Sequence, residues 1–204
     1  MEVQQEIPFT IYAENTPNPN SMKFVANKLL IESDPIEFIN VSAAAASPLA
    51  MKLFQLPFVS RVFIAGNYVA VSKIDAIEWH DVVMELRIMI TEFLNDGNTV
   101  LDKAALKLSQ EVIASSEATD LDQREDLTEI DLQISDILDE FVRPAVEQDG
   151  GAINFHSFEK GVVTVNLRGA CSGCPSSSLT LKSGIETILK RLVPEVKEVV
   201  AVEL

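Results

Sequence analysis

Residues 162–192 read VVTVNLRGACSGCPSSSLTLKSGIETILKRL and contain both cysteines of the chain. Val163, Val165 and Leu167 alternate with polar residues, which predicts a strand with one buried face. Residues 177–192 predict a helix, because Pro175 and the serines that follow favour a helix N-terminus. Cys171 and Cys174 therefore fall in a loop between a strand and a helix.

The segments on either side of this loop predict one small domain from about Asp131 onward. Residues 132–142 predict a helix, Pro144 should kink or restart it because proline lacks an amide hydrogen, and Gly150-Gly151 should end it. A hairpin turn at residues 159–161 should join a strand near residues 153–155 to the strand before the cysteines. A last strand follows over 196–202. One apolar stripe of the first helix is made by Leu132, Ile134, Ile137, Leu138, Phe141 and Val142.

A second set of elements is expected in residues 1–94. Prolines and asparagines in 15–20 predict turns, and short strands are expected at 22–25 and 29–31. Pro48 can begin a short helix. Residues 59–65 and 68–72, joined by Gly66-Asn67, predict a hairpin. Apolar residues at helical spacing predict an amphipathic helix over 81–94.

The stretch between these segments, residues 95–130, has nine acids and three bases. Such a composition predicts a mobile acidic linker, with residues 100–113 able to form a helix. The sequence therefore predicts an α+β chain of two small domains, 1–94 and 131–204, joined by the linker 95–130. The expected order of the C-terminal domain is helix, strand, strand, helix, strand.

Composition narrows the functional classes. The chain has 204 residues and a formal net charge of -15, which opposes binding to nucleic acid or to anionic membranes. No stretch approaches the roughly 18 apolar residues that a membrane span needs. Residues 1–10 contain no Lys or Arg, so neither a secretory nor an organelle signal is visible, and a cytoplasmic protein is expected.

The spacing Cys171-x-x-Cys174 is typical of three kinds of site. These are an iron–sulfur cluster, a dithiol/disulfide redox site and half of a structural zinc site. Amides at the following helix N-terminus favour negative charge, which predicts a lowered cysteine pKa and favours an anionic cluster. The thioredoxin-like reading expects its motif after the first strand of a βαβ unit, whereas two hairpin strands precede it here. The loop is expected to be exposed.

No other feature competes with the cysteines as a site. His80 is expected to cap or pack at a helix start, and His156 to face solvent from a strand, so neither is expected to bind metal. Lys182, Lys190 and Arg191 could meet an acidic partner but are more simply a solvated helix face. No catalytic triad, phosphate loop or carboxylate pair stands out, so no catalytic residues and no enzyme activity are predicted.

Several stretches of the chain together resemble a known family of proteins. Residues 143–151, RPAVEQDGG, resemble the opening of the NifU-like C-terminal domain, and residues 169–177, GACSGCPSS, resemble its cluster loop. Residues 181–186 and 193–196 continue the match. Residues 16–20, 23–24, 47–50 and 53–54 resemble the N-terminal domain of Nfu-type proteins. The resemblance implies an iron–sulfur scaffold or carrier, usually of a 4Fe-4S cluster and less often of a 2Fe-2S cluster, with Cys171 and Cys174 as its ligands.

The resemblance also implies partners, namely apo iron–sulfur client proteins and upstream cluster-assembly proteins. Common clusters need about four thiolate ligands, and this chain has two cysteines. A homodimer that shares one cluster would supply four, and a small thiol such as glutathione on a monomer is the alternative. The N-terminal domain shows no ligand set and is expected to dock partners.

Overall fold

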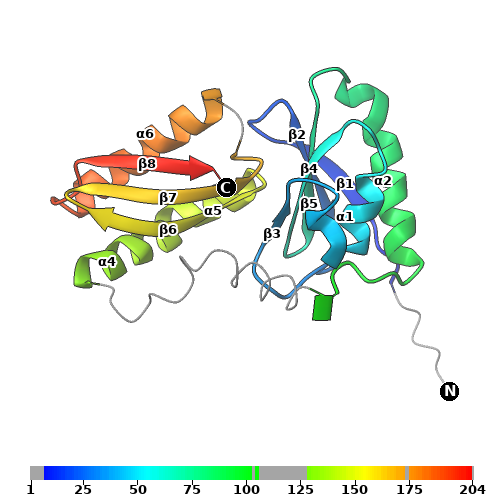
Figure 1. Cartoon of the computed structure of the whole chain (residues 1–204), viewed down its shortest axis with the longest axis horizontal. Helices are drawn as coiled ribbons and strands as arrows, with labels where there is room; N and C mark the ends of the chain where they lie inside the picture. Colours follow the sequence, from blue (N-terminus) through cyan, green and yellow to red (C-terminus); the bar gives the residue numbers. More distant parts are fainter. Residues whose placement is uncertain (1–6, 103, 106–127, 173–174, 204) are drawn as a thin grey trace. The chain divides into compact units, whose positions relative to one another are not determined.

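The computed structural model describes residues 7–102, 104–105, 128–172 and 175–203. Contacts between residues divide the chain into two compact units. The first comprises Met1–Asn15 and Met22–Ser109, and the second comprises Thr16–Ser21 and Gln110–Leu204. Each unit has its own sheet and its own helices, so the chain is α+β (Figure 1). Most of the predicted linker, with most of its expected helix, lies outside the described residues.

The first unit is built on a five-stranded sheet in the order β1-β2-β5-β4-β3. The predicted hairpin is confirmed: β4 and β5 pair antiparallel, and Gly66 takes a positive φ of 44° in the turn between them. The strands are β1 (Ile11–Asn15), β2 (Ser21–Ala26), β3 (Ile36–Phe38), β4 (Val59–Ala65) and β5 (Tyr68–Lys73). The helices are the 3₁₀ turn η1 (Ala43–Ala46), α1 (Pro48–Leu53) and α2 (Trp79–Asn95).

The helices α1 and α2 pack on one face of this sheet. Apolar residues of both helices share a buried core with alternate residues of β2, β4 and β5. Ser47 caps α1 by accepting from the amide of Ala50, and its hydroxyl donates to the carbonyl of Val100 at 2.7 Å. Val100 and Leu101 are buried in the same core, so the first core extends beyond α2.

Two details of the first unit differ from expectation. Residues 29–31 do not form a strand, because the amides of Leu30 and Ile31 both bind the carbonyl of Gly66 instead of pairing with a neighbouring strand. A three-residue strand, β3, pairs with β4 at the sheet edge and was not predicted. Its sequence, Ile36–Phe38, is too short to show a clear alternation.

The second unit has a three-stranded sheet in the order β6-β7-β8. Strands β6 (Gly151–Glu159) and β7 (Val162–Gly169) form an antiparallel hairpin, and β8 (Glu198–Glu203) pairs parallel to β7. Helix α6 (Pro175–Leu192) makes the crossover between β7 and β8. Lys160 and Gly161 take positive φ values in the hairpin turn, as the predicted turn requires.

A continuous helix of three segments precedes the sheet of this unit. The segments are α4 (Glu129–Ile137), the π-helical turn η3 (Leu138–Val142) and α5 (Arg143–Gln148). A reciprocal capping box between Thr128 and Asp131 begins α4. Pro144 lies at the start of α5, as its missing amide hydrogen predicted.

The predicted apolar stripe of this helix is wrong at two positions. Leu132 is 53% exposed and Phe141 is 50% exposed, whereas Ile134, Leu138 and Val142 are buried. A π turn advances less per residue than an α turn, so it rotates the following side chains relative to the core. The turn Leu138–Val142 therefore keeps Val142 in the core and turns Phe141 outward.

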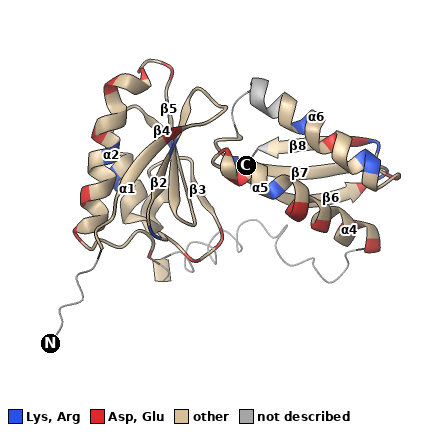
Figure 2. Cartoon of the chain, turned by 180° about the vertical axis from the view of Figure 1, so that it is seen from behind, with Lys and Arg blue, Asp and Glu red and all other residues tan. Residues whose placement is uncertain are grey.

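Charges are distributed unevenly over the helices of the second unit. Acidic residues lie along α4 and η3, whereas lysines and an arginine lie on α6 (Figure 2). Lys190 forms an ion pair with Glu186 and Lys182 forms one with Glu198, so two of the three bases considered as a partner surface have carboxylate partners within the unit. None of the helices in the described part is both long and apolar enough to cross a membrane.

Candidate functional site

Cys171 lies in a tight turn directly after β7. The strand ends at Gly169, whose φ of 73° lets the chain turn back on itself. The amide of Ala170 then donates to the carbonyl of Gly150 at 3.1 Å. The amide and hydroxyl of Ser172 both donate to the carbonyl of Gly169, at 3.1 and 2.9 Å. These bonds fix the backbone on both sides of Cys171.

The side chain of Asn18 also binds this turn. The contact division places Thr16–Ser21 in the second unit, and the Asn18 amide donates to the carbonyls of Ala170 and Ser172 at 3.1 and 3.2 Å. Asn18 is 5% exposed. Asn18 was predicted to lie in a turn, but nothing in the local pattern predicts so distant a partner.

The expectation of an exposed cysteine loop is wrong for Cys171. This residue is a free thiol with only 6% of its surface exposed, and it belongs to the core of the second unit. Burial raises the pKa of the Cys171 thiol to about 12, with the nearby Asp149 carboxylate as the second cause. The expected lowering of the pKa is therefore also wrong for Cys171. The thiol is neutral at physiological pH in the cluster-free protein.

This pKa shift predicts a loss of stability in alkali. The ordinary thiol value is 9.0 and the folded value is about 12, so the unfolded chain ionises first. The stabilisation is complete below pH 9 and is lost as the pH rises toward 12. At pH 10 the loss is about 1.4 kcal/mol. Urea unfolding at pH 8 and pH 10, without oxygen, should show this extra loss in the wild type but not in Cys171→Ala. An equal pH dependence in the two proteins would contradict it.

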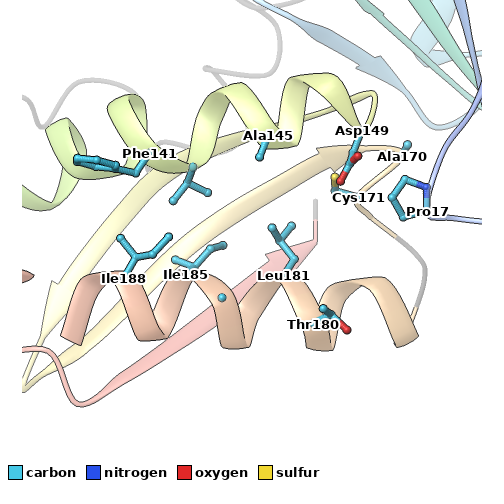
Figure 3. Close-up of a pocket in the computed structure, with 12 residues that line it drawn as sticks. Pro17, Phe141, Ala145, Asp149, Ala170, Cys171, Thr180, Leu181, Ile185 and Ile188 are labelled. Carbon is cyan, nitrogen blue, oxygen red and sulfur yellow. The ribbon is translucent and has the colours of Figure 1, made fainter. Parts of the chain in front are cut away.

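An apolar cavity of about 480 Å³ runs from Cys171 between two helices of the second unit, the η3–α5 segment and α6. Figure 3 shows Phe141 and Ala145 on one side, with Leu181, Ile185 and Ile188 of α6 on the other. Asp149 and Cys171 lie at one end of the cavity (Figure 3). The Cys171 sulfur thus lies at the junction of a polar turn and an apolar surface. Phe141, which η3 turns away from the core, forms part of one wall of this cavity.

In the described part of the chain, the other predicted site residues do not complete a metal site around Cys171. Cys174 lies outside the described residues, as do the side chains of the first turn of α6. His156 is exposed, as expected. The His80 side chain is 78% exposed and lies 3.2 Å from Asp81, so it neither caps nor packs α2. Within the described ranges, no three His, Cys, Asp or Glu side chains are grouped closely enough to hold a metal ion.

Comparison with known proteins identifies both halves of the chain. Residues 134–200 match the model of the NifU-like domain, and residues 11–97 match that of the scaffold protein Nfu/NifU N-terminal domain. The chain is 36% identical over 200 residues to the NifU-like protein 5, mitochondrial, of Arabidopsis thaliana, covering 97% of this chain and 69% of that protein. The chain belongs to the Nfu family of NifU-like proteins. The predicted resemblance is thereby confirmed.

Two further relatives have similar sequence identities to this Nfu-family chain. The NifU-like protein 4, mitochondrial, of Arabidopsis thaliana is 38% identical over 192 residues, which are 93% of this chain and 64% of that protein. The "NFU1 iron-sulfur cluster scaffold homolog, mitochondrial" of Drosophila willistoni is 36% identical over 190 residues, 93% of this chain and 62% of that protein. The chain thus spans somewhat less than two thirds of the length of these two relatives.

The names of these relatives correct one expectation for the Nfu-family chain. All three are named mitochondrial, which contradicts the cytoplasmic location predicted from residues 1–10 and points to the mitochondrion. Targeting segments are separate from the folded domains that they deliver and are removed from the mature protein. The lack of a visible signal in residues 1–10 therefore does not decide the compartment.

Proposed function

We propose that this chain is an iron–sulfur cluster scaffold that binds a cluster through Cys171 and Cys174 and passes it to apo-proteins. The observation that carries the proposal is the placement of Cys171. Its thiol lies in a glycine-bounded turn at the end of β7, inside the stretch that matches the NifU-like domain. The name of the Drosophila willistoni relative, an iron-sulfur cluster scaffold homolog, supports the same role.

The chemistry of Cys171 suits a site that is loaded and emptied. A thiolate is the form that binds iron, so loading must remove the proton that burial holds on this thiol. Emptying the site returns the sulfur to a core position that the turn already defines. The cluster-free state is therefore a folded state in its own right, which a scaffold needs between cargoes.

The cargo that we propose is a 4Fe-4S cluster, with a 2Fe-2S cluster less favoured, held between two chains. Two cysteines per chain supply four thiolates per pair, which matches the usual requirement of about four. Clients with cysteines of their own could displace one chain at a time. A small thiol on a single chain would satisfy the same count and is the alternative.

We assign the remaining parts of the chain to partner recognition. Residues 1–94 would dock the clients and the upstream assembly proteins, residues 95–130 would act as the connection, and residues 131–204 would hold the cluster. The described residues of the first unit contain no group of metal-binding side chains. A docking role therefore fits this unit better than a second cluster site, and no turnover chemistry is assigned to either unit.

The second function considered for the same motif, a dithiol/disulfide oxidoreductase, has less support. Such enzymes attack with a cysteine whose pKa is lowered, since the thiolate is the nucleophile. Burial and the Asp149 carboxylate act in the opposite direction on Cys171. Such a thiol is better suited to alternate between a protonated state and an iron-bound state than to undergo rapid disulfide exchange.

The proposal is tested by reconstitution of residues 131–204 alone. These residues contain both cysteines and every buried residue of the second core, so they should fold and take up iron and sulfide as fully as the whole chain. Circular dichroism checks the fold, and the absorbance of the cluster with iron and sulfide analysis checks the loading. A truncated domain that folds but stays free of iron, beside a whole chain that loads, would contradict the assignment of the two domains.

A further inference from the structure

Gly151 begins β6, and its α-carbon faces the side chain of Cys171. A Cβ built on Gly151 would lie 2.7 Å from the Cys171 Sγ and 3.0 Å from the Cys171 Cβ. It would also lie 2.8 Å from the carbonyl oxygen of Arg168. Real Cβ atoms do not approach other heavy atoms this closely, so only glycine leaves room for the sulfur at this place.

The hairpin register explains why these residues meet. Gly151 pairs with Gly169 across β6 and β7, and the chain turns back directly after that pair. The bonds of Ala170 to Gly150 and of Ser172 to Gly169 then hold Cys171 over the start of β6. The sulfur rests against the backbone of Gly151, in a space that we call the Gly151 socket.

We propose that Gly151 is a positioning residue for Cys171, and that its missing side chain makes the socket which sets the position of the cluster-binding sulfur. The role in cluster binding rests on the function proposed above, whereas the socket itself does not. The three atoms nearest to a methyl group at position 151 belong to the Cys171 side chain and to a backbone carbonyl inside the β6–β7 hairpin. Rotation about one bond can move the sulfur away from such a methyl group, whereas relief of the contact with the Arg168 carbonyl requires a shift of the hairpin backbone.

Other glycines give a comparison of what a methyl group would meet. A Cβ on Gly184, in helix α6, would meet no atom within 4 Å. A Cβ on Gly161 would meet the flexible Lys197 side chain at 2.9 Å, and φ is positive there. Among the described glycines whose surroundings are given, Gly151 alone faces a cysteine. Gly184→Ala is therefore the matched control for Gly151→Ala.

The first test is the alkylation of Cys171 in the full chain. In a Cys174→Ser background Cys171 is the only cysteine, so iodoacetamide reports on it alone. Gly151→Ala should raise the alkylation rate at neutral pH by about tenfold or more, because the sulfur leaves its buried position. Gly184→Ala should leave the rate unchanged. An unchanged rate in a folded Gly151→Ala protein would overturn the proposal.

A double-mutant cycle covers the case in which Gly151→Ala folds poorly. If the methyl group clashes with the sulfur, then Cys171→Ala should restore much of the lost resistance to urea in the Gly151→Ala protein. If the carbonyl of Arg168 is the main obstacle, the two changes will be additive, and the socket proposal is wrong. Both measurements use cluster-free protein, so they remain valid even if the chain binds no cluster.

The last arm tests the link to the cluster. With Cys174 restored, reconstituted Gly151→Ala should lose its cluster to a chelator about fivefold or more faster than the wild type, since displaced ligands bind metal less well. Gly184→Ala should match the wild type. Faster alkylation with an unchanged cluster lifetime would overturn the positioning role. Failure of the wild type to load at all would instead reject the proposed function.

Discussion

Replacement of either cysteine by serine should abolish stable cluster binding. Loss of groups that merely orient a ligand costs about 10–100-fold in metal affinity, so loss of the ligand itself should cost at least as much. After anaerobic reconstitution and gel filtration, Cys171→Ser and Cys174→Ser should retain less than about a tenth of the wild-type iron and sulfide. Normal cluster content in either variant would show that the ligands are elsewhere.

The same experiment should distinguish Cys171 from a surface thiol. Cys171→Ser introduces a hydroxyl at a position that is 6% exposed, which should reduce the free energy of unfolding by about 1–3 kcal/mol. Cys171→Ala avoids the buried hydroxyl and separates ligand loss from this penalty. His80→Ala is the control for a histidine ligand: its side chain is 78% exposed, and both stability and cluster content should be unchanged.

Cluster binding should convert a monomer into a dimer with one cluster per two chains. Two chains are needed to provide about four thiolates, and a two-fold pair does so with a single kind of contact. A net charge of -15 on each chain opposes association in the absence of the cluster. Anaerobic light scattering with iron, sulfide and protein analysis should show a monomeric apo-protein and a dimeric holo-protein.

Controls with salt and thiol separate the dimer from its alternatives. If repulsion between the acidic chains matters, higher salt should make the holo dimer easier to form, because salt screens exposed charges. Added glutathione should have no effect on the chain-to-cluster ratio. A monomeric holo-protein that carries one full cluster per chain, without added thiol, would rule out the shared site.

Local sequence signals predicted the elements whose cause is itself local. The β4–β5 hairpin follows from Gly66-Asn67 between two apolar runs, and α1 follows from Pro48. The helix restarts at α5, where Pro144 lies in the first turn, as its missing amide hydrogen predicted. The short β3 could not be predicted, because a three-residue strand depends on the β4 edge to which it binds.

Features that depend on packing across the chain were missed. The π turn at Leu138–Val142 changes which side chains face the core, and a regular 3.6-residue period cannot express it. Phe141 was therefore placed in the core, although it lines the cavity beside Cys171.

The position of Cys171 between a strand and a helix was predicted, but its environment was not. The motif gave Cys171, but the exposed loop and the lowered pKa that we expected are both wrong. Burial is decided by the β6–β7 hairpin, which brings Gly151 against the sulfur from 20 positions earlier in the chain. The Gly150-Gly151 pair was interpreted as a helix stop and as part of the family resemblance, with no link to Cys171. The register of the predicted hairpin, which pairs Gly151 with Gly169, is the signal that could have revealed its second role.

Direct transfer of a cluster to a client is the measurement that tests the central claim. Reconstituted protein, freed of excess iron and sulfide, is mixed without oxygen with an apo-enzyme that needs a 4Fe-4S cluster, in the presence of an iron chelator. We expect the enzyme to regain activity as the cluster absorbance leaves this chain, while equal amounts of free iron and sulfide fail under the same chelator. Activation no faster than with free iron and sulfide would contradict a carrier role for this protein.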